Sequence, residues 1–414
     1  MRGRMLLGSV VALLVAAVVW LPTAGAAPTS GYIVVLKGSV GSARAVAGEQ
    51  ARAHDLVVGH VYGYALKGYS ATMSSADAQA LRADPRVAYV SQDRPVHVDA
   101  QVLPTRIDRV DAQVLPTGID RVDGELSSTV SGDGAGSVSV DVAVIDTGID
   151  TTHPDLNVAG GVNCSTGRSF NDGNGHGSHV AGIIAARDND IGVVGVAPGA
   201  HLWAVRVLNN AGSGSFASVI CGVDWVTAHK GLIKVANMSL GGAGTEPARP
   251  GCATGDPLHD AICNSVAAGV TYTVAAGNSA SDAANFVPAA YDEVITVSAL
   301  ADFDGKPGGL GSPTCRADED DTLANFSNFG PDVDLIAPGV CILSTYKRGG
   351  YATLSGTSMA SPHAAGAAAL YQAAHPGASP ATVKSALRQA GNLGWNNADD
   401  PDGIKETLVN VDAL

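Results

Sequence analysis

Charged side chains make up only 15% of this 414-residue chain, and basic ones are the scarcer, with 25 Lys and Arg against 39 Asp and Glu. A basic surface that binds nucleic acid is therefore not expected. With 46% hydrophobic residues, the composition excludes a disordered chain and predicts a large core with room for a second, smaller domain. The acidic excess is uneven, because residues 1–111 hold 11 basic and 8 acidic side chains (+3) and residues 112–414 hold 14 and 31 (−17).

Long apolar runs are missing after the amino-terminal run from Met5 to Leu21, which follows Arg2 and Arg4. The run ends before a small-residue A-x-A site, so residues 1–26 predict a secretory signal peptide. A membrane anchor is the alternative, but the run is shorter than most spanning helices. We therefore expect a secreted, extracellular protein without a membrane anchor.

Cysteine is missing from the whole first part of the chain, because all six cysteines lie at or after Cys164. In an exported chain they imply disulfides, and six cysteines allow 15 pairings. Spacing favours Cys252 with Cys263. No histidine block of catalytic type adjoins any cysteine, so none is predicted to be a nucleophile.

The segment from Gly31 to Val98 predicts a compact unit of order β-α-β-β-α-β, followed by an extended tail. The strands are expected at 32–36, 57–62, 64–73 and 87–90, and the helices at 46–54 and 75–83. A unit of this size and pattern is also compatible with a small binding module.

A short tandem repeat follows this unit. Copy one, Ala100–Asp111, is repeated as copy two, Ala112–Asp123, and the copies differ only at Arg106 and Gly118. The period is too short and the copies too few for a solenoid, so we interpret the repeat as a local duplication.

A serine among small residues marks the segment Ser355–His363, which continues into the apolar run Ala364–Leu370. The neighbours of Ser358 let a substrate backbone approach, and the run predicts a buried helix that begins at or just after the serine. The unpaired N–H groups of its first turn would face a reacting carbonyl. A turn that only caps a core helix is the alternative. A nucleophilic serine also needs a base and an oxyanion donor.

Asp146 and His176 are the candidates that complete such a site. Asp146 follows a strand predicted at 138–145, and functional groups gather beyond the carboxyl ends of strands in an open parallel sheet, although an Asp before Thr-Gly is often only a turn former. His176, the predicted general base, opens a helix of small residues. His179 could share a metal with it, but no glutamate follows His176 as in zinc proteases, so His179 is predicted to be structural.

Three blocks, Val144–Gly148, His176–Gly182 and Gly356–Pro362, resemble the catalytic blocks of subtilisin-like serine proteases in the order Asp, His, Ser. The resemblance covers residues 112–414. It implies an α/β fold, with a doubly wound, mostly parallel sheet and helices on both faces, and a serine endopeptidase acting through an acyl-enzyme. By this resemblance Ser358 is the nucleophile, His176 the base and Asp146 its orienting partner. Ser178 stands where the family usually has Thr, and keeps the hydroxyl.

The small unit, at Asp84–Val90 and its tail, resembles the inhibitory prosegment of the same family. Residues 27–99 are then a small α+β, ferredoxin-like prodomain that inhibits its own enzyme, residues 100–111 a duplicated linker and residues 112–414 the peptidase. Copy two looks like the amino terminus of mature subtilisins. Cleavage is therefore expected near Ala112, with cleavage before Ala100 as the alternative.

The oxyanion donor is expected at Asn278, which follows a β-rich run and would act with the backbone N–H of Ser358. By resemblance, an extended substrate adds main-chain hydrogen bonds between two segments. The residues implied to bind it are Ser213, Gly214, Ser215, Ser239, Leu240, Gly241, Ala275, Ala276 and Gly277, with Phe216 at a more distant pocket. Their small, uncharged walls predict a broad, apolar side-chain preference.

A structural calcium ion is implied by the same resemblance, at oxygens of the kind that calcium prefers, and no organic cofactor is expected. Its ligands would be Gln113, Asp155, Arg187, Asn189, Ile191 and Val193. The alternative is an acidic surface loop in which Asp188 and Asp190 are solvated.

The resemblance also pairs Cys164 with Cys221 and Cys315 with Cys341, and we expect a monomer that acts on proteins and peptides. Two rival functions remain open. A sedolisin-type enzyme shares the Ser-Gly-Thr-Ser sequence but uses Glu in place of His, and the His176 block argues against it. A peptide-binding pseudoprotease would keep the groove without turnover, and the complete triad with Asn278 argues against that.

Overall fold

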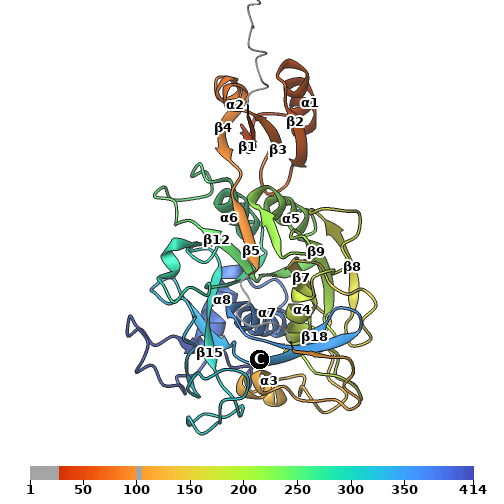
Figure 1. Cartoon of the computed structure of the whole chain (residues 1–414), viewed down its shortest axis with the longest axis vertical. Coiled ribbons are helices and arrows are strands. Elements are labelled where there is room, and N and C mark those ends of the chain that lie inside the picture. The colour runs from red at the N-terminus through yellow and green to blue at the C-terminus, as the bar shows by residue number, and fades with distance from the viewer. Residues whose placement is uncertain (1–27, 99–104) are drawn as a thin grey trace, which may run out of the picture.

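The computed structural model describes residues 28–98 and 105–414, which form a small domain stacked on a larger one (Figure 1). The small domain comprises β1 (Thr29–Leu36), α1 (Ala43–Ala53), β2 (Val57–Tyr62), β3 (Gly68–Ser74), α2 (Ser75–Arg82) and β4 (Val87–Gln92). Its antiparallel strands pair in the order β2-β3-β1-β4. The predicted element order is therefore confirmed.

Local capping explains where the two helices of the small domain begin. The Ser42 hydroxyl accepts the Ala45 N–H before α1, and the Ser74 hydroxyl accepts the Asp77 N–H before α2. Strand β3 begins later than predicted, at Gly68. The preceding N–H groups of residues 63–65 donate instead to the Asp224 carboxylate of the large domain.

The large domain is built on a nine-stranded sheet whose main path runs β20-β17-β15-β13-β11-β7-β9-β8, with all of these pairs parallel. The strands are β7 (Asp141–Asp146), β8 (Val158–Asn163), β9 (His201–Arg206), β11 (Ile233–Met238), β13 (Thr271–Ala275), β15 (Ile295–Ala301), β17 (Leu335–Pro338) and β20 (Thr407–Leu408), with β16 (Thr322–Leu323) antiparallel to β15. The chain winds from β7 to one side and then returns to the other through β11. The predicted doubly wound α/β fold is thus confirmed.

Helices cover both faces of this sheet. One face carries α4 (His176–Ala185), α7 (Thr357–Ala374) and α8 (Pro380–Ala390), and the other carries α5 (Phe216–Ala228) and α6 (Pro257–Ala267). The small domain rests on α5 and α6 (Figure 1). Shorter elements are β5 (Pro95–Val98), β6 (Thr105–Ile107), α3 (Thr117–Arg121), η1 (Gly124–Leu126), β10 (Ser213–Ser215), β12 (Leu240–Ala243), η2 (Ala283–Asn285), β14 (Phe286–Val287), β18 (Ile342–Tyr346) and β19 (Gly350–Leu354).

Within residues 28–98 and 105–414, no helix has the length and apolar character needed to cross a membrane. The predicted signal peptide, residues 1–26, lies outside the described residues.

Candidate active site

Ser358 is the second residue of α7 and is fully buried at the carboxyl edge of the sheet. Pro362, four residues on, has no N–H to give to the Ser358 carbonyl. The Ser239 hydroxyl supplies the missing donor at 2.8 Å, and the Ser358 hydroxyl donates back to the Ser239 carbonyl at 3.3 Å. These two hydrogen bonds tie the first turn of the helix to Ser239, the residue before β12.

Asp146 ends β7, and His176 begins α4 directly beside it. The ring atom Nδ1 of His176 lies 2.9 Å from both carboxylate oxygens of Asp146, and both residues are buried. A β-carbon at Gly177 would lie 2.1 Å from the Gly148 carbonyl oxygen, so only glycine lets the helix start this close to the strand end. A carboxylate in this position fixes the ring and its Nδ1–H tautomer.

The turn before His176 is held by Asp172, which the sequence interpretation missed. One carboxylate oxygen of this buried residue accepts the Thr147 hydroxyl at 2.9 Å and the Gly175 N–H at 2.8 Å. The other accepts the hydroxyl and the N–H of Ser178, at 2.7 and 2.9 Å. The Ser178 hydroxyl thus has a defined task, and the only sequence signal for Asp172 was its Asn/Gly-rich surroundings.

Asn278 lies just past β13, with its amide oxygen held by the N–H of Thr357 at 2.8 Å and by the Thr357 hydroxyl at 2.9 Å. Because both donors use the oxygen, the amide nitrogen lies on the opposite side of the planar group. Thr357 immediately precedes Ser358, so the amide is fixed relative to the nucleophile. The substrate-wall candidates Ala275, Ala276 and Gly277 lead into it and are buried.

His179 is fully buried, and burial lowers its pKa to about 3. Its Nε2 lies 3.0 Å from the carbonyl oxygens of Ile342 and Ala352. A neutral ring that donates to backbone there is a structural group, as the sequence analysis predicted.

The two predicted substrate segments flank a strand of the small domain. Strand β5 pairs antiparallel with β10, which is Ser213, Gly214 and Ser215, and with β12 at Leu240 and Gly241. The Val98 N–H also donates to the Gly212 carbonyl at 2.9 Å. The small domain therefore fills the groove with its own tail, in the manner of an added strand.

Arg94, just before β5, clamps this arrangement. Its guanidinium lies 4.2 Å from the ring centroid of Phe216, the residue predicted at the distant pocket, and 2.6 Å from Asp256. Stacking and ion pairing together anchor the tail where it enters the groove.

The predicted calcium ligands converge around Asp155, which is fully buried. Its carboxylate accepts the Asn189 side-chain amide and the Val193 N–H, both at 2.9 Å, and burial raises its pKa to about 6. The Gln113 amide oxygen accepts the Asn189 N–H at 3.0 Å. The Arg187 N–H donates to the Asp155 carbonyl at 2.9 Å. Ile191 lies on the same loop, with its N–H on the Asn189 amide oxygen.

Asp188 in this loop is not simply solvated. Its carboxylate accepts the N–H groups of Gly132, Gly134 and Gly136 and the Gln113 side chain. It organises the glycine-rich loop, so the acidic-loop alternative is incorrect at this residue.

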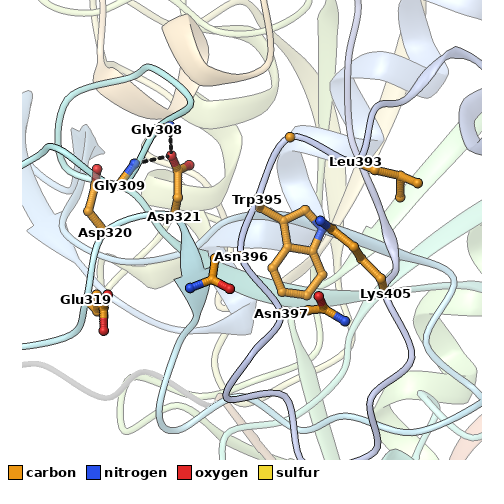
Figure 2. A pocket seen from close by; sticks show the side chains of 11 residues that line it. Gly308, Gly309, Glu319, Asp320, Asp321, Leu393, Trp395, Asn396, Asn397 and Lys405 are labelled. Carbon is orange, nitrogen blue, oxygen red and sulfur yellow. Dashed lines mark hydrogen bonds between the residues drawn. The ribbon is translucent and has the colours of Figure 1, made fainter.

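The three disulfides are Cys164–Cys221, Cys252–Cys263 and Cys315–Cys341, as predicted. A separate cavity of about 580 Å³ lies between the loop at Gly308–Asp321 and the segment from Leu393 to Lys405, with Trp395 in its wall (Figure 2). None of the active-site candidates lines it.

A buried Asp–His pair, a serine at a helix start and a groove that accepts an extended chain define a serine endopeptidase. Residues 138–404 match the Subtilase family (Peptidase_S8), and residues 31–99 match Peptidase inhibitor I9. The chain is 40% identical over 289 residues to Subtilisin DY of Bacillus licheniformis, covering 69% of this chain and 93% of that protein. It is 39% identical over 330 residues to an Alkaline protease of Shouchella clausii, covering 79% and 75%.

A crystal structure of a cold adapted subtilisin-like serine proteinase matches with a TM-score of 0.57 and 33% identity, over 71% of this chain and 97% of that one. The chain therefore belongs to the subtilase family and carries an I9-type prodomain.

Proposed function

We propose that Ser358, His176, Asp146 and Asn278 hydrolyse peptide bonds through an acyl-enzyme. His176 takes the proton of the Ser358 hydroxyl and returns it to the leaving amine, while Asp146 orients the ring and stabilises its charge. Asn278 and the Ser358 N–H stabilise the oxyanion. The 2.9 Å contact of Asp146 with His176 carries this proposal, and it argues against a sedolisin-type site that uses Glu.

A fluorophosphonate probe tests the proposal, because only an activated serine is labelled. Wild-type enzyme should react, and Ser358→Ala should not react, should lose peptide hydrolysis and should remain unprocessed. Absence of labelling in wild-type mature enzyme would favour the pseudoprotease alternative. Asn278→Leu should lower kcat by about 10²–10³, and a loss below roughly tenfold would mean that Asn278 is not the donor.

We propose that the enzyme processes itself and that the first cut falls near Ala100. Strand β5 ends at Val98 in the groove, and the I9 match ends at residue 99. The Asp111–Ala112 bond lies elsewhere, because the neighbouring Val110 carbonyl accepts the Gly192 N–H and the Asp111 side chain is 77% exposed. Cleavage near Ala100 is therefore favoured over cleavage near Ala112, which is the reverse of the expectation from the sequence. Residues 99–104 lie outside the described residues, so the position rests on where β5 ends.

Amino-terminal sequencing distinguishes the two cuts through the single difference between the copies. A mature chain from Ala100 has arginine as its seventh residue, and one from Ala112 has glycine. Full maturation of Ser358→Ala in a protease-free host would contradict self-processing.

A structural calcium ion fits the loop around Asp155. The buried carboxylate has only neutral hydrogen-bond donors, and the side-chain oxygens of Gln113 and Asn189 accept N–H groups of the same loop. Calcium would supply the missing positive charge, held by these groups and by backbone oxygens of Arg187, Ile191 and Val193. Copy two would thereby be tied to the peptidase domain.

We further propose a secreted monomer with a broad, apolar side-chain preference. Secretion rests on the predicted signal peptide. The preference rests on the uncharged walls at Ser239–Gly241 and Ala275–Gly277. Hydrolysis of a peptide library that varies the residue before the scissile bond tests it, and selection of a charged residue would contradict it.

A further inference from the structure

A histidine and two glutamates converge outside the active site. His259 lies in the first turn of α6, only 1% exposed, and its Nε2 lies 3.3 Å from Glu246 Oε1 and 3.2 Å from Glu293 Oε2. One ligand atom from each residue lies within 4.8 Å of those of the other two. The ring is fixed by an edge-on contact with Tyr291, at 4.9 Å between centroids.

Both short contacts are ion-pair distances, but neither has the geometry of a hydrogen bond. Nε2 of His259 is buried and has no hydrogen-bond partner, and the same holds for Oε2 of both glutamates. In a tetrahedral zinc site with bonds of about 2.0–2.1 Å, neighbouring ligand atoms lie about 3.3 Å apart. The two separations match that spacing, so these side chains, which lie within ion-pair distance of each other, are also placed to surround one cation.

The charge around the cluster is strongly negative. On the other side of the ring, His259 Nδ1 lies 3.7 Å from Asp260, and the nearby carboxylate of Asp292 also acts on Glu246. Lys384, which acts on Glu293, is paired with Asp334 at 2.8 Å. A single imidazolium among these carboxylates leaves an excess of negative charge. A divalent cation between the three side chains would reduce it.

The outer ring nitrogen has the partners expected of a metal ligand. Nδ1 of His259 faces Asp260 Oδ1 at 3.7 Å and the Thr254 hydroxyl at 3.4 Å. Asp260 is itself held by the Thr254 N–H and hydroxyl, each at 2.7 Å, and by the Tyr89 hydroxyl at 2.5 Å. A carboxylate behind a ligating histidine commonly fixes the ring and strengthens the ligand.

We propose that Glu246, His259 and Glu293 form a zinc-binding site, distinct from the active site and from the calcium loop. One imidazole and two carboxylates form a ligand set that suits zinc, and three protein ligands leave a fourth position for water. The glutamate side chains are 34% and 25% exposed, so an ion can enter from solvent.

The site would join three segments of the peptidase domain. Glu246 follows β12, which forms one wall of the groove; His259 lies in α6; and Glu293 precedes β15. The loop between β12 and α6 also carries Asp256, which binds Arg94 of the prodomain. Zinc would therefore cross-link the surface on which the prodomain tail is anchored.

Zinc titration of the full chain tests the proposal. The Ser358→Ala protein, which cannot digest itself, is stripped with a chelator, saturated with calcium and titrated with ZnCl₂ in a calorimeter. We expect one zinc ion per chain at micromolar affinity or tighter. Co²⁺ in place of zinc should give the visible absorption of a four-coordinate site.

Glu246→Gln and Glu293→Gln remove single ligands at partly exposed positions and should each weaken zinc binding by about tenfold or more. Glu319→Gln, which removes an exposed carboxylate elsewhere, should bind as the parent does. Absence of saturable zinc uptake by the parent protein overturns the site, and leaves His259 as a charged group between two glutamates. Parent-like binding by Glu246→Gln and Glu293→Gln overturns it equally, since the ion would then lie elsewhere, for example at His176.

Discussion

The two copies of the repeat differ at one position, yet their described residues adopt different structures. In copy one, Thr105–Ile107 is an edge strand that pairs with β19, Arg106 opposite Ala352. In copy two, the corresponding residues open helix α3, Thr117–Arg121, and Ile119 is buried in the main core. The same local sequence is thus compatible with strand and helix, and the surroundings decide between them.

The arginines of the two copies show the same contrast. Arg121 is only 3% exposed and pairs with Asp302 at 2.9 Å and Asp321 at 2.7 Å. Its counterpart Arg109 is 82% exposed and pairs with Asp111, two residues away. A buried pair is costly to break, whereas an exposed one contributes little.

Gly118 explains why copy two, and not copy one, occupies the buried position. A β-carbon there would lie 2.7 Å from His363 Nε2 and 3.2 Å from the Ile342 side chain. Arginine, which copy one has at this place, cannot fit against those atoms.

Making copy two identical to copy one should have the largest effect. Gly118→Arg forces a long charged side chain against buried His363 and should destabilise the protein by about 4 kcal/mol or more. Secreted yield and the urea midpoint of unfolding, in the Ser358→Ala background, measure this. The reciprocal change, Arg106→Gly on the edge strand, should cost less than about 1 kcal/mol. Equal losses of stability from the two changes would mean that residue 118 does not decide which copy occupies the buried position.

The second comparison removes one arginine from each copy. Arg121→Met should cost about 3–5 kcal/mol, because it leaves Asp302 and Asp321 buried without their cation. Arg109→Met should cost about 0–1 kcal/mol. Free energies of unfolding from urea titrations measure both, and similar losses would refute the contrast.

The loss of stability caused by Arg121→Met should also depend on pH. Burial raises the pKa of Asp302 to about 7, above its value in the unfolded chain, so the contribution of Asp302 to stability falls as pH rises from about 4 to 7. At pH 5 Asp302 is mostly protonated and needs no cation. The loss should therefore be smaller at pH 5 than at pH 8, and a pH-independent loss would contradict this account.

Calcium bound through copy two should raise the free energy of unfolding by about 2–3 kcal/mol when its concentration is about a hundred times its Kd. Copy one should contribute nothing to this stabilisation. A chelator should lower the melting temperature of the Ser358→Ala protein and speed self-digestion of wild type. Gln113→Ala in copy two should reduce this sensitivity, and Asp155→Ala with Asn189→Ala should abolish it. Gln101→Ala, the matched change in copy one, should not. Equal melting temperatures of the wild-type sequence with and without calcium would mean that the site is empty.

Deleting copy one should have the smallest effect. Removal of residues 100–111 loses edge strand β6 and restores the same Ala-Gln-Val sequence after residue 99, so processing should continue and stability should change by less than about 1 kcal/mol. The mature chain should then begin at Ala112. A precursor that stays uncut would contradict this. Copy one would then be needed as a spacer that lets β5 lie in the groove while copy two keeps its place in the peptidase domain.

Local patterns predicted where Asp146, His176 and Ser358 lie, because each is at a strand end or a helix start that its own neighbours specify. The periodic pattern of the prodomain likewise predicted its element order. Such features depend on residues a few positions apart, and a sequence displays them directly.

Other features depend on contacts between distant segments, and only the tertiary structure decided them. Arg121 meets its partners at Asp302 and Asp321 across the domain, and Glu246 meets His259 through a loop that no motif marks. The conformations of the two copies are also decided by tertiary contacts. Their local sequence permits either conformation, and the choice follows from the space beside His363 that accepts Gly118 and excludes arginine.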